Sequence, residues 1–209
     1  VRDLLLQEDH GRVCDAQGRM VKGMFADDDE LGIDVHAVRD DGTNRRSLPW
    51  GRDGNEFCQG HQCWIGRSTD AITSTGTKTA AGDGVQELIA GKPTVDAGHR
   101  GRLTPGGQRC DLSRTFDHPG FYHFATDISG RRLITDRPAD IPGGELWLAS
   151  LPQAWCNPIE TWQFLLNTKA TWRKETHTHP FLSPDGRMAF FNSDESGQLQ
   201  AYMITGLPN

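Results

Sequence analysis

Three histidines stand at matching places in three similar stretches of this sequence, and this repeat is the strongest constraint on its fold. His61, His123 and His179 each lie seven residues before a residue of a polar turn, and a short apolar stretch follows each turn. The histidines are 62 and then 56 residues apart. A recurrence at this spacing indicates a repeated structural unit that carries a histidine at the same corner each time.

The segments between these histidines predict short β-strands. Only 35% of the residues are hydrophobic, and 24 glycines and 11 prolines provide turns. Alternating or short apolar runs bounded by turn residues indicate strands, at residues 4–7, 20–24, 33–38, 45–50, 60–65, 71–75, 85–90, 108–112, 122–128, 133–136, 145–150, 161–166, 189–192 and 199–204. One more strand is expected to start near Glu175. Three or four strands in each unit of about 60 residues are typical of a β-propeller blade.

We therefore predict an all-β fold, with a single β-propeller domain, or a fragment of one, over residues 1–209. A single antiparallel blade cannot bury both of its faces, so blades pack around an axis and their inner strands line a channel. The length suits about three to four blades of four antiparallel strands, whereas complete rings have ~4–8 blades. In such a ring, equivalent positions converge at one end of the axis, and His61, His123 and His179 occupy such positions.

Charge and hydropathy limit the classes of partner. The formal net charge is −6, so the chain has no globally basic field, and no nucleic-acid partner is expected. No segment approaches the ~20 apolar residues of a membrane span. No signal peptide is visible, and we expect a cytoplasmic or periplasmic location with no membrane partner. The five cysteines are odd in number and irregularly spaced, which favours free thiols over a disulfide framework.

The segment around His177 and His179 predicts a metal site. Residues two apart on a strand share a face, so these two histidines would point the same way if the segment is a strand. Neutral imidazole suits Mn, Fe, Ni or Zn. The alternative is a pair of solvent-facing histidines. A second possible site, zinc bound by Cys58, His61 and Cys63, lacks a fourth ligand, so we expect Cys63 in the core instead.

The run from Thr176 to Asp194 reads THTHPFLSPDGRMAFFNSD. It resembles the C-terminal blade of the oligogalacturonate lyases, which are polysaccharide lyases of pectin degradation built on a seven-bladed β-propeller. Three more segments fall into register, in the same order and at similar spacing: Asp40 to Asn44, Gly60 to Trp64, and Tyr122-His123 with residues 130–136. Ser-Pro-Asp-Gly occurs in many propellers, but a preceding His-x-His-Pro with two further histidines in register is more specific. The similarity extends over residues 33–204.

The resemblance implies metal-assisted β-elimination on a short acidic oligosaccharide. It implies a divalent cation, typically Mn²⁺, held by His123, His177, His179 and a glutamine. It also implies that His61 is the catalytic base, which removes the proton at C5 of a uronate before the glycosidic bond at C4 breaks. A neutral histidine is a suitable base near its ordinary pKa, and a cation that neutralises the uronate carboxylate makes the neighbouring proton more acidic.

Two residues depart from the family pattern. Lys174 stands where the family has the glutamine ligand, and Asp34 stands where it has an arginine. A charged lysine does not ligate a cation; it would either repel the cation or contact the substrate carboxylate directly. We therefore expect the acidic oligosaccharide to be bound by Lys174, Arg100 and Arg137, with Arg102 and Arg173 as alternatives.

Two other functions remain open from the sequence. One is a non-catalytic propeller of the translocation-protein (TolB) or WD40 type, which binds protein or sugar in the same channel. The other is a metal-dependent hydrolase on the same scaffold. The blades missing from a complete ring are expected to come from the rest of a longer chain.

Overall fold

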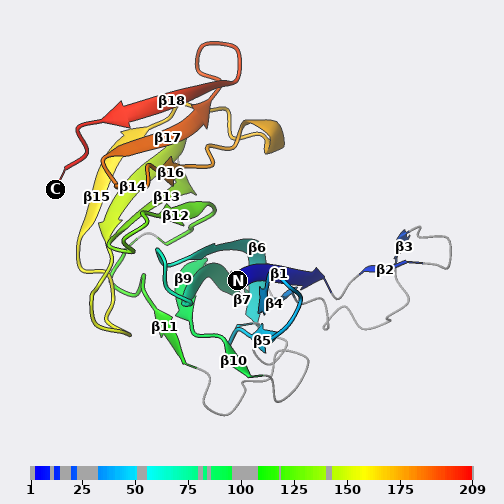
Figure 1. Cartoon of the computed structure of the whole chain (residues 1–209). Coiled ribbons are helices and arrows are strands. Elements are labelled where there is room, and N and C mark those ends of the chain that lie inside the picture. Colours follow the sequence, from blue (N-terminus) through cyan, green and yellow to red (C-terminus); the bar gives the residue numbers. More distant parts are fainter. Residues whose placement is uncertain are drawn as a thin grey trace.

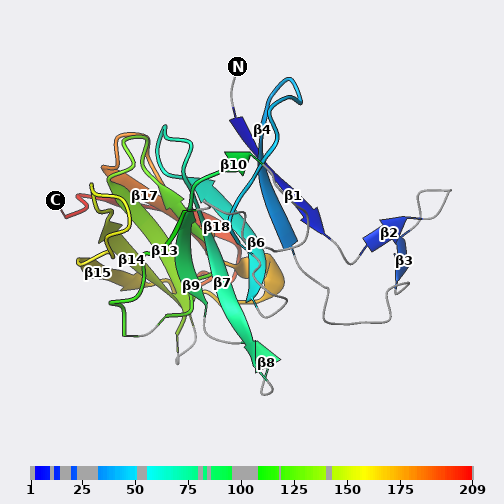
Figure 2. The same ribbon diagram turned by 90° about the horizontal axis from the view of Figure 1, so that it is seen from below.

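The computed structural model of the chain describes residues 3–9, 12–14, 20–22, 33–50, 56–79, 82–83, 86–95, 108–117, 119–139 and 143–208. In these residues, β-strands form four antiparallel sheets that follow one another around an arc (Figure 1), in chain order apart from β10 (Thr94–Val95), which joins the first sheet. A small hairpin, β2 (Arg12–Cys14) and β3 (Met20–Lys22), stands apart from the sheets (Figure 2). No helix among the described residues is long and apolar enough to cross a membrane.

The first sheet has the order β1 (Asp3–Asp9), β4 (Ile33–Arg39), β5 (Arg46–Ser47) and β10 (Thr94–Val95). The second runs from β6 (Glu56–Trp64) through β7 (Ala71–Thr79) and β9 (Glu87–Gly91) to β11 (Arg109–Asp111), and the short β8 (Gly82–Asp83) pairs with β7. The third consists of β12 (Phe124–Thr126), β13 (Arg132–Pro138), β14 (Gly144–Ser150) and β15 (Trp162–Asn167). The fourth has three strands, β16 (Phe181–Leu182), β17 (Met188–Ser193) and β18 (Gln200–Thr205).

Three apolar clusters join the sheets face to face, one at each junction. Val35, Leu48 and Trp50 of the first sheet region pack with Ala71 and Ile89 of the second. Ile72, Leu88 and Ala90 of the second sheet pack against the third, in a cluster completed by Leu133, Ala149, Phe121 and Ile159. Ile134 and Leu148 of the third sheet pack against Leu182 and Ala189 of the fourth. Successive sheets stacked on their faces around an arc are the blades of a β-propeller, which confirms the predicted fold class.

The central strands are buried on both faces, and their sequences reflect this. Neighbouring side chains of a strand point to opposite faces. In β13, Leu133 therefore faces the second sheet and Ile134 faces the fourth, and both are fully buried. In β7, Ala71 and Ile72 divide in the same way. Strands buried on both faces have continuous apolar runs instead of alternation, and these are the runs that the sequence shows after each turn.

The turns after the three histidines also join neighbouring blades. The Gly66 amide donates to Thr126 Oγ1 at 2.9 Å, and Thr126 Oγ1 donates to the Trp64 carbonyl at 2.8 Å. Gly66 has φ +56°, and a Cβ on it would lie 2.4 Å from the Gly130 nitrogen, so only glycine fits there. One blade further on, the Ile128 amide donates to the Pro184 carbonyl at 3.0 Å. These contacts hold the equivalent corners of successive blades side by side.

Candidate metal centre

The fold brings the three predicted repeat histidines together with His177. His61 lies on β6, His123 directly precedes β12, and His177 and His179 lie on the segment before β16. The first strands of these three blades are neighbours. The ring centres of His61 and His123 are 4.5 Å apart, and those of His123 and His179 are 3.9 Å apart. The convergence expected from the repeat is therefore present in the structure.

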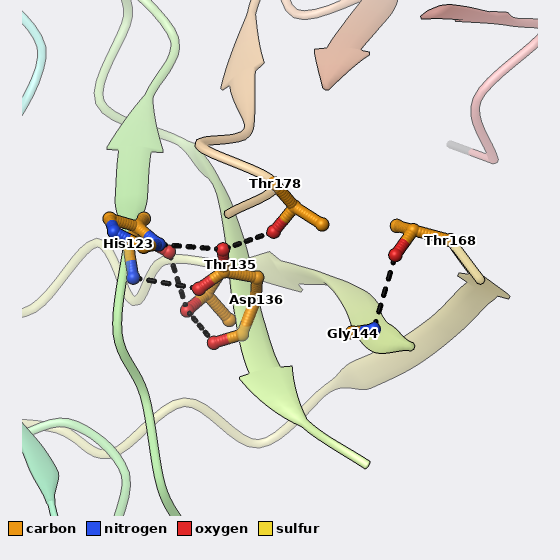
Figure 3. A network of polar contacts seen from close by, with 6 residues as sticks. All are labelled: His123, Thr135, Asp136, Gly144, Thr168 and Thr178. Atoms are coloured by element: carbon orange, nitrogen blue, oxygen red, sulfur yellow. Dashed lines mark hydrogen bonds and ion pairs between the residues drawn. The ribbon is translucent and has the colours of Figure 1, made fainter. Parts of the chain in front are cut away.

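His123 is fixed by a buried carboxylate, that of Asp136 on β13 (Figure 3). The His123 amide donates to Asp136 Oδ1 at 2.7 Å, and His123 Nδ1 lies 2.8 Å from Oδ2. The Asp136 side chain is fully buried and His123 is 5% exposed. The sequence interpretation assigned no role to Asp136. The available signal was an acidic residue at the end of a strand that is otherwise apolar, thirteen residues after a repeat histidine.

The segment from Arg173 to Pro180 is not a strand, and the expectation of a strand starting near Glu175 is wrong. Lys174–Thr176 form a single 3₁₀ turn (η3), and residues 177–180 are irregular. His179 has φ +40°, which is incompatible with a β-strand. His177 and His179 therefore do not share a strand face. They reach the same site because the chain bends between them.

An aromatic residue that the sequence interpretation passed over, Trp172, packs against His177. The two rings are stacked at 5.3 Å with an interplanar angle of 28°. Trp172 has φ +55°, a rare conformation for a bulky residue that tends to occur at functional sites. It also packs closely on Gly144, where a Cβ would lie 2.1 Å from Trp172 Cζ3. Tyr122 contacts the other rings edge-on, at 5.9 Å from Trp172 and 6.4 Å from His177.

The three histidines His123, His177 and His179 offer one nitrogen each, and these atoms lie within 4.8 Å of one another. His123 is buried, His177 half-buried and His179 exposed, so the group is open to solvent on one side. Burial lowers the pKa of His177 and of His179, and His123 lowers them further. Neutral imidazole is a common ligand of divalent transition metals. The donor set therefore fits a divalent cation with open coordination positions.

His61 is beside this group but is not one of the three. Burial first, and then the neighbouring His123 ring, lowers the pKa of His61 to about 4, so the His61 ring is neutral near pH 7. Its Nδ1 atom is buried and has no hydrogen-bond partner among the described residues. A neutral imidazole beside a cation site has the protonation state that a general base requires.

Of the predicted substrate-binding side chains, the structure describes that of Arg137. Arg137 forms an ion pair with Glu145, at 2.9 Å between Nη1 and Oε2, and no described contact joins it to the histidines. Arg100 lies outside the described residues, and so do the side chains of Lys174 and Asp34. The binding of substrate by Lys174, Arg100 and Arg137 stays a prediction.

Cys63, considered with Cys58 and His61 for a zinc site, belongs to the core instead. It packs against the cluster between the second and third sheets. Burial raises the pKa of its thiol to about 12, whereas zinc is bound by the thiolate. Cys63, Cys110 and Cys156 are free thiols, as expected, although Cys156 is exposed.

Comparisons with known proteins support the fold. No protein-family model and no curated protein match the sequence. An oligogalacturonate lyase from Vibrio parahaemolyticus has a similar structure, with TM-score 0.54, 17% identity, and coverage of 85% of this chain and 46% of the lyase. Nidogen in its complex with laminin is similar at TM-score 0.54 and 9% identity, with coverage of 98% and 58%. TolB from Acinetobacter baumannii follows at TM-score 0.48 and 11% identity, with coverage of 83% and 35%.

This chain thus spans about half the length of the lyase and nidogen chains. At these identities, the two likenesses show the β-propeller fold alone.

Proposed function

We propose that the protein is a polysaccharide lyase that cleaves short uronate oligosaccharides, such as oligogalacturonate, by metal-assisted β-elimination. The observation that carries this proposal is the convergence of four histidines from three blades. Three of them offer ligand nitrogens within 4.8 Å of one another, and the fourth is a neutral ring 4.5 Å from His123. The structural likeness to an oligogalacturonate lyase supports the same reading.

His123, His177 and His179 would hold the cation, with Mn²⁺ as the ion that we propose. Bound there, a divalent cation neutralises the uronate carboxylate and makes the proton at C5 more acidic. His61 takes that proton, and the electron pair left on C5 forms a double bond to C4 as the glycosidic oxygen departs. Without cation and substrate, burial first and then the neighbouring His123 lower the pKa of His61 to about 4, so the ring is neutral near pH 7 and can accept the proton.

The test mixes the protein with Mn²⁺ and oligogalacturonate and follows the ultraviolet absorbance of the unsaturated product. We expect absorbance to rise with the wild-type protein and not with a His61→Ala variant. A neutral oligosaccharide of similar length is the control substrate, because it has no acidic proton next to a carboxylate. New reducing ends without absorbance would point to the metal-dependent hydrolase instead. A folded, cation-loaded protein that gives neither signal with several uronates would refute the lyase proposal.

A second candidate is a non-catalytic propeller that binds an acidic sugar or a protein at the same end of the axis. It is favoured by Lys174, which replaces the expected glutamine ligand, and by the low pKa of His61, which makes this ring a weak base before substrate binds. The TM-score with nidogen, a protein solved in complex with laminin, equals the TM-score with the lyase, at 0.54. Retention of oligogalacturonate without cleavage would favour this candidate.

A further inference from the structure

We propose that Asp136 is the positioning residue of the histidine centre, which sets the tautomer of His123 and ties the two histidine-bearing segments together. This inference rests on the proposed function only in assuming that the centre binds a cation. It concerns a residue that contacts none of the reacting atoms. The hydrogen bonds of its carboxylate carry the inference.

Three donors from two different blades converge on the Asp136 carboxylate. His123 contributes its amide to Oδ1 and its ring Nδ1 to Oδ2, at 2.7 Å and 2.8 Å. The Thr178 hydroxyl donates to Oδ2 across the boundary between the third and fourth blades (Figure 3). Thr178 is fully buried and stands between His177 and His179 in the chain. One carboxylate therefore holds His123 on one side and the segment with the other two histidines on the other.

Further hydrogen bonds hold this segment at Thr171 and at the Thr178 carbonyl. The Thr171 amide and hydroxyl both donate to the Asp194 carboxylate, the amide at 2.7 Å. The Thr178 carbonyl accepts from the Asn192 amide at 2.7 Å. The backbone is left-handed at Trp172, directly after the first anchor, and at His179, directly after the second. Such backbone persists only where the surroundings fix it, and the bonds of Thr178 to Asp136 and to Asn192 hold the residue between His177 and His179.

The bond from His123 Nδ1 decides which nitrogen faces the centre. A carboxylate accepts hydrogen bonds, so Nδ1 carries the proton and Nε2 keeps the free electron pair. Nε2 is then the nitrogen that His123 can offer as a ligand. A carboxylate behind a metal-binding histidine orients the ring and increases its basicity.

An Asp136→Asn substitution should reverse the tautomer with little change of shape. The His123 amide requires an acceptor, so the side-chain oxygen of asparagine must take the place of Oδ1. The NH₂ group then occupies the place of Oδ2 and faces both His123 Nδ1 and the Thr178 hydroxyl. Nδ1 becomes an acceptor and the proton moves to Nε2, where it blocks coordination.

The experiment uses two readouts on the wild-type protein and the Asp136→Asn variant. The first is the ¹⁵N NMR spectrum of the imidazoles without cation, in which we expect an Nδ1–H tautomer for His123 in the wild type and Nε2–H in the variant. The second is Mn²⁺ affinity by calorimetry, which we expect to fall about 10- to 100-fold in the variant. An unchanged His123 tautomer in the variant would overturn the inference. If the wild-type protein binds Mn²⁺ and the Asp136→Asn variant binds it with the same affinity, the inference is also overturned. That result would not affect the lyase proposal.

Matched variants separate positioning from loss of structure. Asp127 lies in the same blade, is 4% exposed, and accepts from the Arg131 and Arg132 amides at 2.8 Å and 2.9 Å. Asp127→Asn makes the same chemical change at a site away from the histidines, and we expect it to leave Mn²⁺ affinity unchanged. Thr178→Ser keeps the hydroxyl and should keep the affinity, whereas Thr178→Val should lower it. Equal losses in Asp127→Asn and Asp136→Asn would mean that Asp136 is only structural.

A failure of the lyase proposal would look different. Absence of unsaturated product, together with the tautomer and affinity changes described above, would leave Asp136 as the positioning residue of a cation-binding propeller without lyase activity.

Discussion

His61 and His123 occupy the same position in successive blades but have different surroundings. Thirteen residues after each histidine, the next strand carries Ser74 in one blade and Asp136 in the other. The Asp136 carboxylate binds Nδ1 of His123 at 2.8 Å. Nδ1 of His61 is buried and has no hydrogen-bond partner among the described residues. A repeated scaffold thus presents two identical rings, and the residue opposite each one differs.

This difference matches the two functions that we propose for the rings. A histidine backed by a carboxylate is held in one tautomer and is a better metal ligand. His61 is half-buried and has no such partner at Nδ1, and burial lowers its pKa to about 4, so the ring stays neutral and keeps a proton-accepting nitrogen. In this chain, equivalent corners of two successive blades thus differ in the residue that the neighbouring strand places beside the histidine.

The largest expected effect on stability comes from replacing Asp136, compared with replacing Ser74 at the equivalent position. Asp136→Ser leaves the His123 amide and the Thr178 hydroxyl buried without their carboxylate acceptor. We expect a loss of about 3 kcal/mol in the free energy of unfolding, because each unsatisfied buried donor costs about 1–3 kcal/mol. Ser74→Ala at the equivalent position removes one hydroxyl and should cost about 1 kcal/mol. Urea unfolding of the cation-free proteins measures both, and equal losses would remove the distinction between the two corners.

A smaller effect on the free energy of unfolding is expected from the titration of the His61 ring, which makes stability depend on pH. Its pKa is about 4 in the folded protein, below the ordinary value of 6.5. Between these values the unfolded chain binds more protons, so the stability of the cation-free protein rises as pH increases from 4 to 6.5. A His61→Gln variant lacks this contribution, and its stability should rise less over the same range. Urea unfolding at a series of pH values measures the difference, and identical slopes of stability against pH would argue against a lowered pKa at the half-buried His61.

The smallest expected effect on stability concerns a hydrogen bond that is present at both corners. The carbonyl of each histidine accepts a hydrogen bond from a threonine hydroxyl on the next strand, at 3.1 Å in both blades, from Thr73 and Thr135. Substituting either threonine by valine should cost about 1 kcal/mol, the usual contribution of one hydrogen bond. We expect the two losses to agree within a few tenths of a kcal/mol. Thermal unfolding of both variants provides the comparison, and clearly unequal losses would show that the two corners differ beyond the Ser74 and Asp136 positions.

The fold and the meeting of the histidines could be predicted from the sequence because both follow from the repeat. The spacing of His61, His123 and His179 reflects the blade period, and the blade places their segments side by side. Asp136 could not be recognised in this way. Its strand is buried on both faces, so the pattern of apolar residues does not show which way the carboxylate points, and its partner Thr178 is 42 residues away.

The path of the chain near His179 was also beyond reach of the sequence pattern. The alternation in Thr176-His177-Thr178-His179 is typical of a strand, but the backbone at His179 is left-handed. The bend depends on contacts with residues that are distant in the chain, such as Asp136 and Asp194, and local sequence does not reveal those contacts.

The central claim is that equivalent histidines of successive blades have different functions, and two variants test it directly. Mn²⁺ stoichiometry by elemental analysis and the rate of unsaturated product are measured together for His61→Ala and His123→Ala. We predict that His61→Ala keeps one bound cation and loses about 100- to 10,000-fold in rate, the usual contribution of a general base, and that His123→Ala loses the cation itself. Loss of the cation in both variants, or its retention in both, would contradict the account.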